Sequence, residues 1–388
     1  MHEPSGEPRP LSTTKKLLYT TLVLVITFGT PELLLRALWR PAVPEIPPVM
    51  ERRFVTWLSS LSEGPNRNEE LYRVDPELIW SLRPNASIDS INRHHGPGGE
   101  QQPVRITINP AGYRGAPAPS HKSAPSELRV LCMGDSNFFG YPLDDRQVFP
   151  QALRDTLTRR LPAGASITVI NGGVPGYSSL QGRRLYERQF ATLEYDWLLL
   201  SYLNNDAWTQ PHADRELLTP AAARSRRFTA WSDHLALVRW GRSLLPRATT
   251  AEKDLVPRVS LPEYLETYRF FIASAAARGA RVLIIDYRAY DEYRAYSEAL
   301  RDFAARSGVI YFPVRERLQE YYAQRAQRAP PAPYADRADA VVRRWGAQTL
   351  REKPQLWIYA EYFPEHLNEI GVAWLVDQVA PILGSEHR

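Results

Sequence analysis

The strongest constraint on the fold is an alternation of short apolar runs with helix-length segments that begins at Leu128. Five runs have the composition and length of buried strands: RVLCM, ITVIN, DWLLLSYL, RVLIID and VIYFPV. Longer segments separate them, among them residues 149–161 and 261–278. Nearly continuous apolar strands that alternate with helices are typical of a parallel sheet covered on both faces. The sequence therefore predicts an α/β domain with its site at the carboxyl ends of the strands.

A second constraint is an apolar segment near the N-terminus. Residues 17–31 carry no charge, and the apolar character continues past the carboxylate of Glu32 to Trp39. This length matches the roughly 20 residues that cross the hydrocarbon core of a bilayer. A cleaved signal peptide has a similar pattern, but no small-residue cleavage site follows the run, so an uncleaved membrane anchor is the preferred interpretation. A buried core helix is the remaining alternative.

These patterns divide the chain into four parts. The expected parts are a polar tail (1–16), a transmembrane signal anchor (17–39), a proline-rich stalk and extension (40–126), and an α/β domain (127–388) with insertions near 207–257 and 315–354. The insertions are rich in Arg, and the first contains Trp208, Trp231 and Trp240. We interpret them as amphipathic helices that pack Trp inward and Arg outward. Stacking on sugars or binding of anionic groups is the alternative.

Charge and cysteine content exclude several classes of function. The net charge is +5, but the basic residues are spread along the chain and form no basic stripe, so no nucleic-acid partner is expected. The single cysteine, Cys132, excludes an intramolecular disulfide and a cysteine-rich zinc site. The pair His94 and His95 lies in a Gly- and Pro-rich stretch without other ligands at metal-binding spacing. We therefore expect no metal and no cofactor.

Polar residues follow three of the predicted strands, and a histidine precedes the last predicted helix. In chain order these groups are Gly134-Asp135-Ser136, Asn171 with Gly176, Asn205-Asp206, and His366. Each has an ordinary structural explanation: a turn, a glycine-rich loop, a helix N-cap or a structural histidine. Together they supply a serine, amide donors and a general base at one edge of a sheet. Such a set is typical of nucleophilic acyl transfer.

This ordered set resembles the four sequence blocks of the SGNH, or GDSL, hydrolases over residues 128–383. The resemblance implies a flavodoxin-like three-layer α/β/α sandwich and no cofactor. It also implies a nucleophile (Ser136), an oxyanion hole (the amides of Ser136 and Gly176 with the side chain of Asn205), a base (His366) and supporting residues (Asp135, Asn171 and Asp206). The apolar N-terminal segment is similar to that of membrane-anchored bacterial members.

Two positions depart from the pattern of this family. Leu203 stands where the third block usually begins with Gly, and Phe363 stands where the family has the Asp of its catalytic triad. Loss of that carboxylate typically lowers the rate on the order of 10⁴-fold, because the imidazole is no longer held in its productive tautomer. The candidate substitutes are Glu361, Glu365 and a backbone carbonyl. Glu361 is preferred, because Glu365 is adjacent to His366 and is expected to point away from its ring.

The sequence thus predicts a serine-dependent esterase or acyl hydrolase. Its expected substrates are O-acyl esters of glycans or lipids outside the cytoplasmic membrane, on the periplasmic side, with the N-terminal helix as the membrane contact. Two alternatives stay open. One is a carbohydrate O-acetyltransferase of the same fold. The other is a catalytically degenerate module that binds a glycan or a protein, which the Phe363 position favours.

Overall fold

The structure is a computed structural model of the full chain. It describes residues 12–39, 71–91, 103–141, 143–162, 164–232, 234–244, 255–324, 339, 341–342, 346–360 and 363–384. The chain forms two compact units. The smaller unit combines residues 1–46 with 224–249, and the larger one contains residues 47–223 and 250–388. Residues 40–70, the first part of the predicted stalk and extension, and the pair His94–His95 lie outside the described residues.

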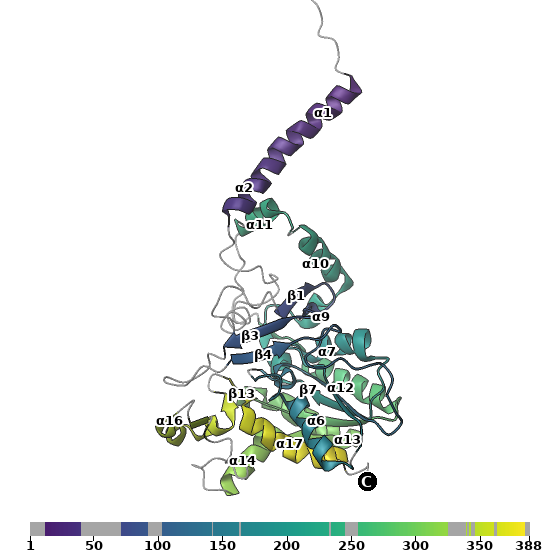
Figure 1. The fold of residues 1–388 in the computed structure, drawn as a ribbon, viewed down its shortest axis with the longest axis vertical. Coiled ribbons are helices and arrows are strands. Elements are labelled where there is room, and N and C mark those ends of the chain that lie inside the picture. Colours follow the sequence, from purple (N-terminus) through teal and green to yellow (C-terminus); the bar gives the residue numbers. More distant parts are fainter. Residues whose placement is uncertain are drawn as a thin grey trace, which may run out of the picture. The chain divides into compact units, whose positions relative to one another are not determined.

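In the smaller unit, α1 (Thr13–Leu24), the π-helical turn η1 (Val25–Gly29) and α2 (Thr30–Leu38) form one continuous helix (Figure 1). This helix of 26 residues is long and apolar enough to cross a membrane, and none of its apolar window is buried. It begins earlier than the predicted residue 17, because the Ser12 side chain accepts the Lys15 N–H and caps it. The finding supports a membrane anchor by length and composition.

The larger unit is built on a five-stranded sheet in which every neighbouring pair of strands is parallel. Its strands are β5 (Leu128–Gly134), β6 (Ile167–Asn171), β7 (Trp197–Ser201), β10 (Arg281–Asp286) and β11 (Ile310–Pro313). Their order across the sheet is β11-β10-β7-β5-β6. All five coincide with predicted runs. This order is the flavodoxin-like one, with its switch point between β5 and β7.

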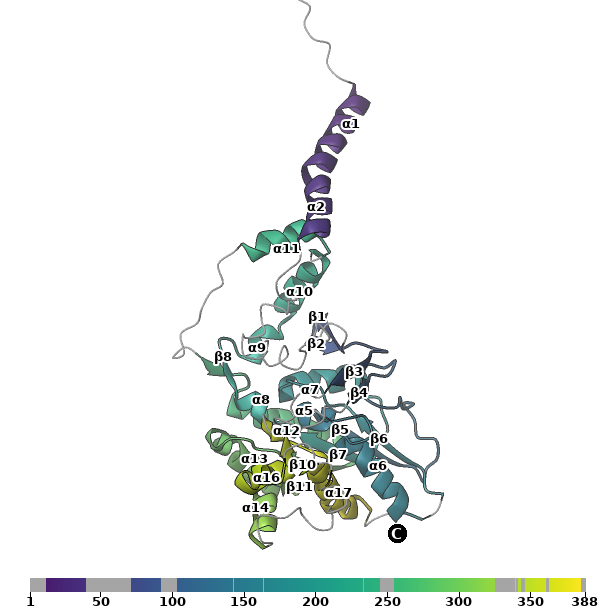
Figure 2. The same cartoon turned by 60° about the vertical axis from the view of Figure 1, so that its left-hand side comes forward.

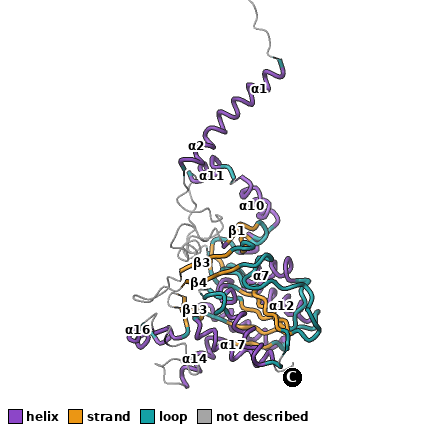
Figure 3. Tube along the Cα trace, viewed as in Figure 1, coloured by secondary structure: helices purple, strands orange, loops and turns teal. Residues whose placement is uncertain are grey.

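Helices cover both faces of the sheet, as Figures 2 and 3 show, and each face has its own apolar core. One face is covered by α7 (Ser179–Leu185) with its π-helical continuation η2 (Tyr186–Phe190), α12 (Leu261–Ala276) and α13 (Arg294–Ser307). The other is covered by α6 (Phe149–Arg160), α14 (Val314–Gln324) and α17 (Glu369–Gly384). Because successive strand residues alternate between the two cores, the strands are apolar throughout. The predicted three-layer α/β/α sandwich is confirmed.

The segment before the sheet forms two antiparallel hairpins: β1 (Tyr72–Asp75) with β2 (Ile79–Leu82), and β3 (Ser87–Ile91) with β4 (Pro103–Thr107). Apolar residues of both hairpins, such as Trp80 and Ile106, belong to the core that α7 and α12 share. In its described part, the N-terminal extension therefore packs on the α/β domain.

The remaining elements are short, apart from two helices within residues 207–257. They are α5 (Ser136–Phe139), α8 (Asn204–Ala207), β8 (Thr209–Gln210), α9 (Asp214–Leu217), α10 (Pro220–Ser232), α11 (Ala236–Ser243), β9 (Val256–Pro257), η4 (Asp291–Tyr293), α16 (Ala347–Glu352), η6 (Pro354–Trp357), β12 (Tyr359–Ala360) and β13 (Phe363–Leu367). One prediction about the insertion at residues 207–257 is wrong. Its Trp side chains do not all pack inward, because Trp231 is 65% exposed and Trp240 is 39% exposed. A local pattern defines an apolar face but not what covers it.

Candidate active site

The candidate nucleophile and base lie side by side although 230 residues separate them in the sequence. Ser136 is the first residue of α5, directly after β5, and His366 lies in β13, just before α17. The His366 Nε2 atom lies 2.8 Å from the Ser136 Oγ atom. Both side chains are buried. This is hydrogen-bond distance, which a histidine needs to accept the proton of a serine hydroxyl.

A tight strand-to-helix turn presents Ser136 at the edge of the sheet. A Cβ atom on Gly134 would come within 2.8 Å of the Ser201 carbonyl oxygen on β7 and of the Phe138 ring, so only glycine fits there. The next residue, Asp135, caps α5 by accepting the N–H of Asn137 at 2.9 Å. The turn follows β5, so Ser136 lies at the switch point of the sheet, where this class of fold forms its sites.

Asn205 reaches this turn from α8, the short helix that follows the neighbouring strand β7. Its Nδ2 atom donates to the Asp135 Oδ2 atom at 3.1 Å, which fixes the amide with its nitrogen toward the serine turn. One of its two N–H bonds is thereby used, and the second is left for another acceptor. Burial raises the pKa of Asp135 to about 6, while hydrogen bonds from Asn137 and Asn205 oppose this shift. Above that pH the carboxylate form orients Asn205.

Gly176 belongs to the loop between β6 and α7, where it has a φ of +77°. This left-handed backbone conformation favours glycine. No residue in the described part of the chain accepts a hydrogen bond from the N–H of Gly176 or of Ser136. Val174 in the same loop donates its N–H to the Gly134 carbonyl, at 3.1 Å, so the loop is tied to the serine turn.

Arg258, which the sequence analysis missed, fixes the loop of Gly176 by bonding to its backbone carbonyl. Its guanidinium donates to the Gly176 carbonyl at 2.7 Å and to Gln181 Oε1 at 2.6 Å, and it forms an ion pair with Asp214 at 2.9 Å. Arg258 and Asp214 are both buried. No local signal marks this residue, because its partner Gly176 lies 82 positions earlier.

The N-terminal extension also contacts the site loops. Trp80 on β2 donates its indole N–H to the Pro175 carbonyl at 3.2 Å, and its backbone carbonyl accepts the Tyr177 hydroxyl at 2.5 Å. Arg114 is fully buried and donates to the Phe139 carbonyl, at 2.9 Å, at the end of α5. The extension therefore positions the loop that contains Gly176 and the helix that begins with Ser136.

The other two predicted supporting residues act at a distance from the serine. Asn171 accepts the N–H of Gly173 at 3.0 Å and donates to the Phe139 carbonyl at 3.4 Å, so it joins the β6 loop to α5. Asp206 accepts the backbone N–H and the hydroxyl of Ser179, at 2.9 and 2.5 Å, at the start of α7. Burial raises the pKa of Asp206 to about 7.

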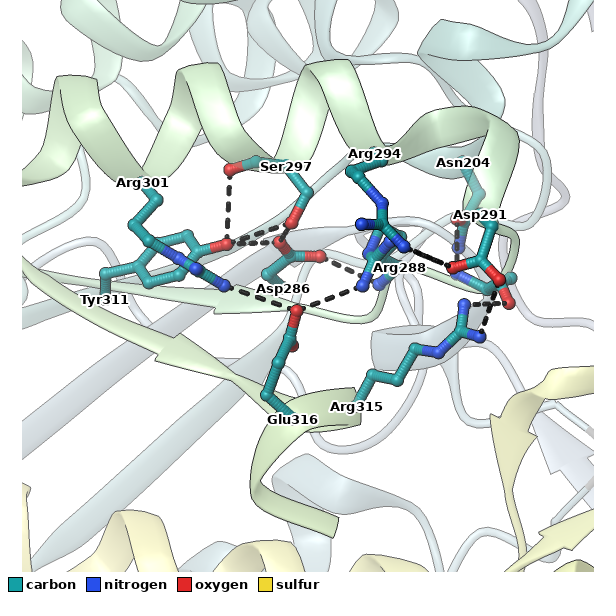
Figure 4. Close-up of polar contacts among 11 residues, drawn as sticks. Asn204, Asp286, Arg288, Asp291, Arg294, Ser297, Arg301, Tyr311, Arg315 and Glu316 are labelled. Atoms are coloured by element: carbon teal, nitrogen blue, oxygen red, sulfur yellow. Dashed lines mark hydrogen bonds and ion pairs between the residues drawn. The ribbon is translucent and has the colours of Figure 1, made fainter. Parts of the chain in front are cut away.

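A second polar cluster, also missed, lies at the carboxyl end of β10 (Figure 4). Asp286, the last residue of β10, accepts the hydroxyls of Ser297 and Tyr311, and burial raises its pKa. Arg288 joins this region to Glu316 at 3.0 Å and to Asp291 at 3.3 Å. Basic and acidic side chains alternate in the cluster and pair with one another. We therefore assign it a structural role.

Asn204 connects this cluster to the candidate site (Figure 4). Its Nδ2 atom donates to the Tyr287 carbonyl at 3.2 Å, and its Oδ1 atom accepts the Ala289 N–H at 3.0 Å. The loop after β10 is thus bonded to the residue that precedes Asn205. This contact steadies the β7 end where Leu203 replaces the Gly of the family pattern.

The predicted acid of the triad, Glu361, cannot be compared with the structure. Glu361 is outside the described residues, and the side chains of Phe363 and Glu365 are not described. The assignment of Glu361 therefore stays a prediction. Within the described part of the chain, no group of three or more His, Cys, Asp or Glu side chains could hold a metal ion.

Comparison with known proteins gives matches among solved structures only. No protein-family model and no curated protein matches the sequence. The fold is similar to a lipase/acylhydrolase from Enterococcus faecalis (12% identity, TM-score 0.40, covering 66% of this chain and 96% of that one). It is also similar to the acetyl xylan esterase AlAXEase (13%, 0.37, 65% and 98%) and to the acetylxylan esterase Axe2 from Geobacillus stearothermophilus (14%, 0.32, 56% and 94%). The residue roles proposed for this chain rest on its own geometry.

Proposed function

We propose that this chain is a serine esterase of the SGNH type, with Ser136 as nucleophile and His366 as general base. The observation that carries the proposal is the 2.8 Å separation of Ser136 Oγ and His366 Nε2 at the switch point of the sheet. A buried serine and histidine from distant parts of the chain, in contact beside unused amide donors, match the requirements of acyl transfer.

The reaction divides into two steps. Ser136 Oγ attacks the ester carbonyl while its proton passes to His366 Nε2, and the carbonyl oxygen becomes an oxyanion. The N–H groups of Ser136 and Gly176, with the second Nδ2–H of Asn205, are the proposed donors to that oxyanion. His366 then returns the proton to the departing alcohol, and an acyl-Ser136 ester forms. Water then attacks this ester while His366 takes its proton. The proton passes from His366 to Ser136 Oγ as the bond to the acyl group breaks, so the acid leaves and the Ser136 hydroxyl is restored.

We propose O-acyl esters of glycans or lipids as the substrate class, with the α/β domain on the extracytoplasmic side of the membrane. The support is the N-terminal helix, which is long and apolar enough to span a bilayer. Such a position restricts the enzyme to substrates of the envelope. Transfer of the acyl group to a sugar hydroxyl would use the same first step, and the second step alone would differ.

Replacement of Ser136 by Ala tests the role of the nucleophile. We expect kcat/KM for a short p-nitrophenyl ester to fall on the order of 10⁴-fold or more, because only the residual acceleration from the oxyanion donors and substrate binding is left without the nucleophile. Ser307, exposed at the end of α13, provides the matched control, and Ser307→Ala should keep full activity. Unchanged hydrolysis in Ser136→Ala would show that the nucleophile is another residue.

A degenerate binding module is the second candidate, and the presence of Phe363 at the position of the triad acid favours it. A fluorophosphonate probe separates the two, because it labels only an activated serine. Labelling that depends on Ser136 excludes a dead site. A folded protein that stays unlabelled after prolonged exposure would be a binding module for a glycan or a protein.

A further inference from the structure

Large apolar side chains that face solvent are concentrated in the smaller unit. Among the described residues, twelve of them lie in the helix Thr13–Leu38, five lie between Phe228 and Leu244, and three lie elsewhere. A soluble surface normally scatters such side chains. The segment that carries α10 and α11 therefore continues, in a part of the chain inserted after β7, the apolar character of the candidate membrane span.

Hydrogen bonds attach the start of α11 to the last turns of that span. The Glu32 carboxylate accepts the N–H groups of Ala236 and Leu237, at 2.9 and 2.8 Å, which are the first two residues of α11. Those N–H groups have no partner within their own helix, and an anion there is favourable. Arg36 pairs with Glu32 at 2.7 Å and donates to the His234 carbonyl at 2.6 Å. Figures 1 and 2 both show α11 beside α2.

The position of this contact along the span fixes its depth in a bilayer. Lys15 and Lys16 precede the uncharged stretch, and Glu32 and Arg36 follow it. When the helix crosses a membrane, these charged residues lie toward its two ends, near the interfaces, because charge is costly in the hydrocarbon core. The start of α11 is bonded to Glu32 and Arg36. It therefore lies at the level of the lipid headgroups.

The exposed side chains on and next to α10 and α11 are of the kinds found at the level of the lipid headgroups. Phe228 and Trp231 are 66% and 65% exposed, and their ring centroids are 5.9 Å apart. Trp240 on α11 and Leu244, the residue directly after this helix, are exposed as well. We call these four side chains the apolar face. Tryptophan is enriched at membrane interfaces.

Basic side chains accompany the apolar face. Arg224 and Arg227 on α10 are exposed to solvent. Short helices with aromatic and apolar residues on one side and Arg or Lys beside them are typical of elements that lie in the plane of a membrane surface. The Arg side chains are then placed to contact lipid phosphates, most of all those of anionic lipids.

We propose that α10 and α11 lie in the headgroup layer of the same bilayer that the helix Thr13–Leu38 crosses, with the apolar face toward the acyl chains. The occupant of this surface is thus phospholipid. The insertion gives the chain a second membrane contact besides its span. The proposal rests on the membrane span and does not depend on the chemistry of Ser136.

A fluorescent label tests the depth of the apolar face in the full-length protein. The only native cysteine, Cys132, is fully buried, so a cysteine introduced at the surface is labelled selectively. Trp231→Cys carries an environment-sensitive dye, and the protein is reconstituted in vesicles of phosphatidylcholine and phosphatidylglycerol. Phe228→Cys is the second position, should Trp231→Cys fold poorly. Tyr290→Cys in the larger unit, at 41% exposure, is the matched control. Leu18→Cys reports insertion of the span.

Lipids with a nitroxide near the headgroup provide the readout. We expect the labels at positions 231 and 228 to be quenched several-fold more strongly than the label at 290, and the label at 18 to be shielded from an aqueous quencher. Equal, weak quenching at 231, 228 and 290 with a shielded label at 18 would overturn the proposal. The apolar face would then bind a protein partner instead of lipid. An accessible label at 18 would overturn both the span and the interface contact.

Discussion

At the scale of single residues, the Asn205 side chain is the third of the proposed oxyanion donors. One N–H of its amide is held by Asp135 at 3.1 Å, and this bond aims the second N–H. Replacement by Ala removes the donor without removing the nucleophile or the base. We expect kcat for a p-nitrophenyl ester to fall on the order of 10²- to 10³-fold with little change in KM, because the donor acts on charge that develops in the transition state.

Steady-state kinetics of Asn205→Ala checks this expectation. A rise in KM with unchanged kcat would mean that Asn205 binds the ground state of the substrate instead, and that the oxyanion is stabilised by the two backbone N–H groups alone.

Asp206 gives the protein a characteristic dependence of stability on pH. Its pKa is raised to about 7 by burial, so the native state binds its proton more tightly than the unfolded chain, where the pKa of Asp is about 3.9. The stabilisation from this proton is complete below about pH 4 and is lost as the pH rises through about 7. Asp206→Asn cannot lose a proton. We expect the wild type to lose on the order of 2–4 kcal/mol relative to this variant between pH 4 and pH 8.

Thermal unfolding of both proteins in detergent, at a series of pH values, measures this difference. The unfolding temperature of the variant should approach or pass that of the wild type as the pH rises. A difference that is independent of pH would show that Asp206 is ionised throughout.

At the scale of elements, the loop between β6 and α7 is held by Arg258 from another part of the chain. The planar guanidinium of Arg258 contacts three acceptors at once: Asp214, Gln181 and the Gly176 carbonyl. Arg258→Lys keeps the charge opposite Asp214 but loses this geometry. We expect kcat to fall about tenfold to a hundredfold, because a small shift of Gly176 misplaces its N–H.

Two further measurements separate positioning from folding. Arg258→Gln leaves the buried Asp214 without its cation and should cost about 3–5 kcal/mol of stability, whereas Arg258→Lys should keep most of it. The pH profile of Arg258→Lys should match that of the wild type, because the substitution leaves the proposed base, His366, unchanged. An Arg258→Lys enzyme with full kcat would show that Gly176 does not need this contact.

The elements differ in how far the sequence specifies them. The five parallel strands were predictable because each is apolar on both faces, and the capped helix α12 was predictable from its length and the Ser260–Glu263 capping box. The order of the polar blocks predicted the contact between Ser136 and His366. Arg258 and Trp80 were not predictable, because their partners lie 82 and 95 positions away in the sequence. Asp286 bonds to Ser297 and Tyr311, and no local pattern identifies these contacts. The inward packing of Trp231 was wrong for the related reason that periodicity does not identify a partner.

At the scale of the whole molecule, the N-terminal extension is part of the site's support. Trp80 contacts the loop of Gly176 through the Pro175 carbonyl and the Tyr177 hydroxyl. Trp80→Phe keeps the aromatic contact with Tyr177 but removes the bond to Pro175. We expect a loss of about 0.5–1.5 kcal/mol in stability and a few-fold decrease in kcat. Trp197→Phe, in the core of β7, is the matched control, and it should lower stability with kcat retained. If kcat is the same in both variants, the contact that Trp80 makes with the Gly176 loop does not contribute to catalysis.

The central claim is that Ser136 carries the acyl group during turnover. Mass spectrometry of protein quenched in acid during hydrolysis of p-nitrophenyl acetate tests it directly, because the acyl-enzyme is a covalent intermediate. We predict one acetyl group on the peptide that contains Ser136, and none there in Ser136→Ala. Continued hydrolysis by the wild type with the acetyl group on another residue, or with no acetylated residue under conditions that trap acyl-enzymes, would contradict the proposed mechanism.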